Sequence, residues 1–150
     1  MKKIYYVILT VLLLNFLPVQ AQGFSVNPGI KLGYIFGEQG GFVFGVEMSF
    51  MHMFDQGPSA GIVLSADLLK GKQIYHIGIQ GSYIAGIDIG PSFYVTKDEC
   101  TLGLGTTIYT GFIIMPYFTI NSFPDKPKQI QLGSYLKLPI YFGEPIRFAG

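Results

Sequence analysis

The chain has 150 residues, of which 49% are hydrophobic, 13% are charged and 20 are glycine. It is too apolar for a disordered protein and too rich in glycine for a helical bundle, and its length fits one domain. The formal net charge of +1, without a basic cluster, argues against a nucleic-acid partner.

The N-terminus has the pattern of a secretory signal peptide. Lys2 and Lys3 precede an apolar run over residues 4–17, and Pro18 and small residues lead to a cut between Ala21 and Gln22. A membrane anchor is the alternative, but the run is shorter than the ~20 residues that cross a bilayer. We therefore expect a signal peptide over residues 1–21 and a single domain over residues 22–150.

From Pro28 onward, large apolar residues alternate with small or polar ones, which is typical of strands whose two faces meet different surroundings. Turn residues at 38–40, 55–58, 70–72 and 124–127 separate the alternating segments. These segments cover residues 29–37, 41–53, 59–69, 73–96, 101–121 and 129–142.

The segments 73–96 and 101–121 are each too long for one typical strand. We expect a tight turn near Ile84-Ala85-Gly86 in the first, and a break between Gly111 and Pro116 in the second. With both breaks the chain has eight strands, and with neither it has six. The short connections favour an all-β antiparallel meander, and closure into an up-and-down barrel removes its unpaired edges.

The two strand faces distinguish two kinds of barrel. A soluble barrel turns its apolar face inward, whereas a transmembrane barrel turns it outward to lipid. One face here consists of Ile, Leu, Val and Phe, and the other is mostly Gly, Ser, Thr and Tyr with few charges. A water-facing surface normally carries more charge, and glycines leave room inside a narrow barrel. The pattern favours a transmembrane barrel with the small face inside.

Charged residues within the strands all fall on the small face: Lys31, Glu47, Asp67, Asp88 and Lys137. His76 is predicted to point inward as well. Because an isolated charge is costly in a narrow interior, we expect Lys31 and Lys137 to pair with acidic residues, in a network with Tyr135 and Gln131. This network is either packing that fills the interior and blocks a pore, or a path for protons or ions.

The chain resembles the small outer-membrane β-barrel proteins of Gram-negative bacteria. Their last strand often carries a sorting signal: a polar residue, a glycine two positions later, and large apolar residues five and seven positions later. Gln131, Gly133, Leu136 and Leu138 fit this pattern. The family signal usually ends at a C-terminal aromatic residue, whereas residues 143–150 follow Phe142 here. The resemblance implies location in the outer membrane and contact with its lipid.

No catalytic or metal-binding motif is visible. His-Glu-x-x-His, Gly-x-Ser-x-Gly, paired cysteines and any Ser/His/acid arrangement are lacking, and the single Cys100 lies in an expected loop. We expect no catalytic residue, cofactor or metal. The predicted function is a non-enzymatic outer-membrane β-barrel with a filled interior, structural or part of an envelope complex. The alternative is a soluble periplasmic, lipocalin-like barrel that binds a hydrophobic molecule.

Overall fold

The structure is a computed structural model that describes residues 19–20, 23–37, 40–54, 57–111, 113–143 and 147–148. Apart from Val19 and Gln20, the expected signal peptide lies outside these residues, and so does the expected cut between Ala21 and Gln22. Within the described ranges, no helix has the length and apolar character needed to cross a membrane.

All secondary-structure elements of the described residues are β-strands. The connections between consecutive strands from β2 to β9 are two to six residues long, as the expected meander requires. The strands are β1 (Val19–Gln20), β2 (Gly23–Phe36), β3 (Gly41–Met53), β4 (Ser59–Leu69), β5 (Lys72–Ser82), β6 (Ala85–Val95), β7 (Cys100–Thr110), β8 (Ile114–Ser122), β9 (Gln129–Lys137), β10 (Ile140–Gly143) and β11 (Arg147–Phe148).

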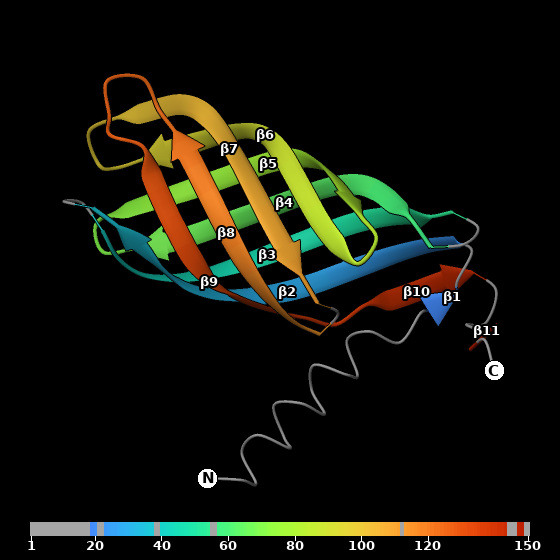
Figure 1. Ribbon diagram of the computed structural model, residues 1–150. Helices are drawn as coiled ribbons and strands as arrows, with labels where there is room; N and C mark the ends of the chain where they lie inside the picture. The colour runs from blue at the N-terminus through green and yellow to red at the C-terminus, as the bar shows by residue number, and fades with distance from the viewer. Residues whose placement is uncertain are drawn as a thin grey trace, which may run out of the picture.

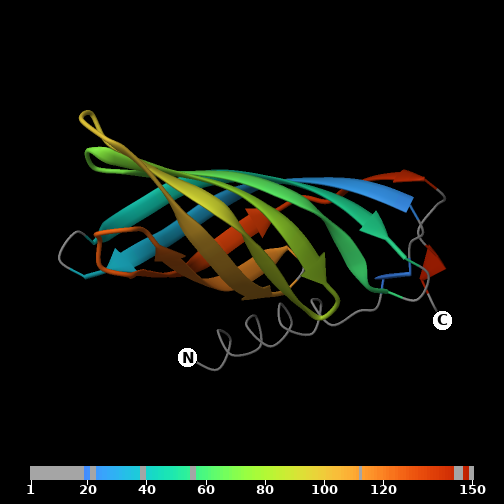
Figure 2. The same cartoon turned by 90° about the horizontal axis from the view of Figure 1, so that it is seen from above.

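Strands β2 to β9 form a closed antiparallel barrel (Figure 1). Each strand pairs with the next one in the chain, and β2 also pairs with β9, which closes the sheet. Viewed from above, the strands cross one another at an angle on opposite walls of the barrel (Figure 2). β1 and β11 pair with each other in a separate two-stranded sheet. The prediction of an eight-stranded up-and-down barrel is confirmed.

Both long sequence segments are split where breaks were expected. β5 and β6 are joined by the two-residue turn Tyr83-Ile84, in which the Tyr83 nitrogen donates a hydrogen bond of 3.0 Å to the Ala85 carbonyl. β7 ends at Thr110 and β8 begins at Ile114, inside the predicted region. These two breaks raise the number of barrel strands from six to eight.

The predicted start of the first strand, at residue 29, is wrong, because β2 begins at Gly23. Pro28 therefore lies inside a strand, although it has no N–H to donate. Its carbonyl accepts a hydrogen bond of 3.0 Å from the Leu138 nitrogen, on the side of β2 that faces β9 and β10. In an antiparallel strand the N–H and C=O of one residue point to the same neighbouring strand. Pro28 thus turns its nitrogen away from β3, and the β2–β3 pairs continue from Gly23 to Ile35.

The predicted last strand, 129–142, is divided into β9 and β10 by residues 138–139. Both pieces follow β2 in one register, since Lys137 pairs with Gly29 and Ile140 pairs with Val26. Figure 1 shows β10 continuing beside β2 after the end of β9. The interruption coincides with prolines on both strands, which cannot donate to the ladder, and the chain does not turn there.

Two further boundaries differ from expectation. Lys72 was expected in a turn, but it begins β5 and pairs with Leu69, because residues 70–71 suffice for the turn. Cys100 was expected in a loop, but it begins β7 and pairs with Val95, and its side chain is exposed.

The barrel is apolar outside and polar inside. Outward side chains such as Leu32, Val46 and Ile108 are 58%, 53% and 52% exposed. Their inward-facing neighbours in the chain, Lys31, Glu47 and Thr107, are buried. The alternation follows the predicted parity along all the barrel strands. The apolar face therefore lies outside, as predicted for a barrel whose surroundings are apolar.

Candidate functional site

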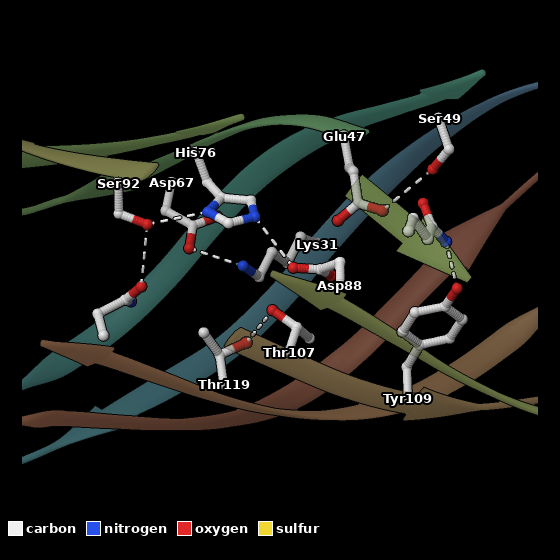
Figure 3. Close-up of polar contacts among 12 residues, drawn as sticks. Lys31, Glu47, Ser49, Asp67, His76, Asp88, Ser92, Thr107, Tyr109 and Thr119 are labelled. Atoms are coloured by element: carbon white, nitrogen blue, oxygen red, sulfur yellow. Dashed lines mark hydrogen bonds and ion pairs between the residues drawn. The ribbon is translucent and has the colours of Figure 1, made fainter. Parts of the chain in front are cut away.

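The candidate site is a layer of ionisable side chains in the barrel interior, here called the charged layer, and all its members except Lys137 are labelled in Figure 3. Each side chain projects inward from a different strand, and each residue is at most 8% exposed. The members are Lys31 of β2, Glu47 of β3, Asp67 of β4, His76 of β5, Asp88 of β6 and Lys137 of β9. The structure divides these six residues into three pairs.

Lys31 and Asp67 form a buried ion pair that spans a glycine. Lys31 Nζ lies 2.8 Å from Asp67 Oδ2. The two residues belong to β2 and β4, and Gly45 of the intervening strand β3 is the register partner of both. A Cβ atom at residue 45 would lie 2.5 Å from Asp67 Oδ1. The missing side chain at Gly45 lets the two charges meet.

Lys137 and Glu47 form a second ion pair in the same manner. Gly29 of β2 lies between them and is the register partner of both. A Cβ atom at residue 29 would lie 2.7 Å from Lys137 Cγ. Lys137 Nζ also donates a hydrogen bond of 3.2 Å to Ser49 Oγ. Since β2 and β9 are the first and last barrel strands, this pair crosses the closure of the barrel.

His76 connects Asp88 to a chain of neutral polar groups. Its Nε2 lies 3.0 Å from Asp88 Oδ1, at ion-pair distance but outside hydrogen-bond geometry. The ring leans over Gly78, where a Cβ atom would lie 2.6 Å from Nε2. His76 Nδ1 lies 2.9 Å from Ser92 Oγ, and Ser92 donates a hydrogen bond of 3.3 Å to Asn121 Oδ1. The chain of contacts is visible in Figure 3.

The sequence shows no Ser/His/acid arrangement, but the structure brings a serine, a histidine and an aspartate into contact. Ser92, His76 and Asp88 all lie at even-numbered, inward-facing positions of neighbouring strands. This shared position in the alternation is the signal from which the sequence could have placed them together. The arrangement nevertheless lacks space for a substrate. Ser92 is fully buried, and the cavity beside His76 measures about 10 Å³, which is room for one water molecule.

Tyrosine rings flank both lysines. The Tyr135 ring centre lies 5.7 Å from Lys31 Nζ and 4.7 Å from Lys137 Nζ, so one ring serves two cations. Tyr117 lies 4.9 Å from Lys31 Nζ. Gln131 was expected to bond with the ion pairs, but its Nε2 donates a hydrogen bond of 2.7 Å to Tyr117 Oη instead. Gln131 therefore touches the ion pairs only indirectly, through the Tyr117 ring beside Lys31.

Two hydrophobic clusters pack around the charged layer. Towards the β8–β9 loop, five buried side chains pack together: Ile35, Val43, Ile74, Tyr94 and Phe123. Tyr109, Met115, Tyr117 and Tyr135 form a second cluster, which includes the rings beside Lys31 and Lys137. The charged groups and these rings thus share one interior compartment, which the first cluster covers towards the β8–β9 loop.

An exposed ion pair lies outside the compartment, in the loops beyond Tyr94. Lys126 Nζ donates a hydrogen bond to Glu99 Oε1 and lies 4.7 Å from the Tyr94 ring centre. This hydrogen bond raises the pKa of the Lys126 ammonium above its usual value. This pair can therefore be compared with the two buried lysine–carboxylate pairs of the interior.

The residues of the sorting pattern occupy both faces of β9 and its extension. Gln131 and Gly133 face inward, whereas Leu136 and Leu138 face outward and are 49% and 62% exposed. Among the described residues, no group of three or more His, Cys, Asp or Glu side chains is arranged to hold a metal ion.

No protein-family model and no curated protein sequence matches the chain. Among solved structures, Neisserial surface protein A (NspA) superposes with a TM-score of 0.61 at 10% sequence identity, covering 81% of this chain and 98% of that one. A de novo designed transmembrane β-barrel has a TM-score of 0.43 at 11% identity, covering 79% and 99%. The Yersinia pestis outer membrane protein Ail has a TM-score of 0.42 at 9% identity, covering 78% and 100%. The likeness to NspA shows that the two chains share a fold.

Proposed function

We propose that the chain is a non-enzymatic outer-membrane β-barrel with a filled interior, which serves a structural role or belongs to an envelope complex. The observation that carries the proposal is the reversed polarity of the barrel: the charged residues Lys31, Glu47, Asp67, Asp88 and Lys137 are buried, while the exterior is apolar. An exterior of this kind suits a hydrocarbon environment and not water. The proposed partners are the lipids of the outer membrane and other envelope proteins.

The proposal includes removal of residues 1–21 during export, and a sorting role for the residues Gln131, Gly133, Leu136 and Leu138. The soluble, lipocalin-like alternative requires an apolar interior that can hold a hydrophobic molecule. The charged layer occupies the interior instead, and the cavity that Lys31, His76 and Asp88 line measures about 10 Å³, which is too small for such a molecule.

Fractionation tests the location. The full chain, expressed with its own N-terminus in Gram-negative cells, is expected in the outer-membrane fraction and to require detergent for extraction. The folded barrel is expected to migrate differently from the heated protein on a gel, because a closed sheet resists the detergent until it is heated. Release of the protein with the soluble periplasmic contents would reject the proposal.

A matched pair of substitutions on one strand tests which solvent meets the exterior. Val46 lies near the middle of β3 and Phe42 near its end, and both side chains face outward. In lipid vesicles, Val46→Arg is expected to lower the free energy of unfolding by about 2–4 kcal/mol and Phe42→Arg by about 0–1 kcal/mol, because the cost of a charge falls towards the bilayer surface. Equal small effects at both positions would show that this face meets water.

Conductance tests the filled interior. Planar bilayers that contain the wild-type barrel or its Glu47→Gln variant are expected to show no steady current. The reason is that the apolar layer around Tyr94 and Phe123 closes the interior whatever the charge at residue 47. Stepwise openings in either barrel would contradict a filled interior and favour a path for protons or ions.

A further inference from the structure

Both ring nitrogens of His76 face polar atoms inside the barrel, and these atoms constrain where its protons lie. Nε2 is 3.0 Å from Asp88 Oδ1. The two atoms are at ion-pair distance but outside hydrogen-bond geometry, so the contact acts through charge. It is favourable when the ring is a cation, because an imidazolium and an ionised carboxylate attract each other at this distance.

The second nitrogen is constrained by Ser92. Its hydroxyl has one proton to donate, and it donates that proton to Asn121 Oδ1 over 3.3 Å. At 2.9 Å from Nδ1, the Ser92 oxygen then has a lone pair that can accept a hydrogen bond from Nδ1–H. This arrangement suits a ring that also carries a proton on Nδ1. An imidazole ring with both nitrogens protonated is a cation.

The charge inventory of the compartment leads to the same result independently. Three carboxylates, of Glu47, Asp67 and Asp88, are buried there with the two ammonium groups of Lys31 and Lys137. A neutral His76 would leave one buried carboxylate without a counter-charge, which is unfavourable in a low-dielectric interior. A cationic His76 gives three anions and three cations.

The groups around His76 on the other strands are neutral or already paired. Thr107 and Thr119 bond to each other across 2.9 Å, and Asp67 of β4 is paired with Lys31 of β2. The cavity that these side chains line is too small to admit more than a single water molecule. Lys72, also buried, lies at the loop end against Tyr94 and outside this layer.

We infer that His76 is a doubly protonated imidazolium in the folded barrel, and that it is the third cation of a charge-balanced interior. Asp88 is its counter-ion, and Ser92 with Asn121 fixes the orientation of the second N–H. This role differs from that of a catalytic histidine, which must keep one nitrogen unprotonated to act as a base.

Nitrogen NMR on the wild-type protein tests the inference directly. Barrels labelled with 15N-histidine in micelles at neutral pH are expected to show two protonated nitrogens for one of the two histidine rings. His52, which faces outward, is the internal comparison, and the variant His52→Gln assigns the signals. A His76 ring with one protonated and one unprotonated nitrogen would overturn the inference.

Substitution of the pair provides a second readout. If His76 is cationic, Asp88→Asn and His76→Gln each leave an unbalanced charge, and each is expected to lower the urea midpoint of unfolding. The double variant His76→Gln/Asp88→Asn restores neutrality and is expected to recover most of that loss. A midpoint for Asp88→Asn that equals or exceeds the wild-type value would contradict the inference, because that result is expected only when the interior holds a surplus carboxylate.

Discussion

Replacing Asp67 by leucine is expected to lower the free energy of unfolding by about 3–5 kcal/mol. Its partner Lys31 is only 3% exposed, so the substitution leaves an ammonium group inside the barrel without a counter-ion. The aromatic rings near Lys31 attract the cation but do not neutralise it. The chain has no tryptophan, so unfolding by urea in lipid vesicles is best followed by circular dichroism or by gel mobility.

Two further variants separate the effect of an unpaired charge from that of altered packing. In Lys31→Met/Asp67→Leu both charges are replaced by apolar side chains, and stability is expected to return close to the wild-type value or above it. Glu99→Gln breaks the exposed pair with Lys126 and is expected to cost less than about 1 kcal/mol. A double variant as unstable as Asp67→Leu alone would show that packing, and not charge, dominates at this position.

Gly133→Ala is expected to lower the free energy of unfolding by about 1–3 kcal/mol, because the added methyl group has no free space. Gly133 and Gly33 are register partners where β9 meets β2, and the Tyr117 side chain lies over both. A Cβ atom at residue 133 would meet the Leu32 carbonyl and would lie 2.5 Å from Tyr117 Oη. Backbone cannot move aside as a flexible side chain can, so the closure of the barrel must shift.

Gly81→Ala is the matched control for that substitution. Gly81 also lies in a barrel strand, but the nearest atom to its added Cβ would be the Ser59 carbonyl oxygen at 4.0 Å. Its unfolding midpoint is expected to equal or slightly exceed that of the wild type, because alanine fits a strand better than glycine does. If both variants lost the same stability, the loss would come from glycine as such and not from the close approach at the barrel closure.

Alternation along the strands allowed the fold to be predicted from sequence. A period of two assigns every residue of a strand to one face, and it placed Lys31, Glu47 and Asp67 together inside before any pairing was known. The two additional turns were predicted from length, because segments 73–96 and 101–121 are each too long for one strand, and the structure breaks them near Ile84 and between Gly111 and Pro116.

Strand ends and side-chain partners were less predictable. Pro28 is a reasonable sign of a strand boundary, and only the register with β3 and β9 shows which way its nitrogen points. The contact of Ser92 with His76 and Asn121 depends on how neighbouring strands are staggered, and alternation carries no information on stagger. The same holds for Gln131, whose amide meets Tyr117 instead of an ion pair.

Gly45 and Gly29, which lie on the strand between the two partners of each ion pair, help to determine the strand register. Sliding one strand by two residues keeps every side chain on its own face, so the apolar pattern alone does not oppose such a slip. It would, however, move Gly45 out from between Lys31 and Asp67, and Gly29 out from between Lys137 and Glu47. When β2 slips past β3 in this way, Lys31 faces Val43 or Glu47 instead of Gly45, and neither original ion pair can form across its glycine. The paired charges and their glycines therefore select, among alignments of equal hydrophobicity, the one that closes the barrel.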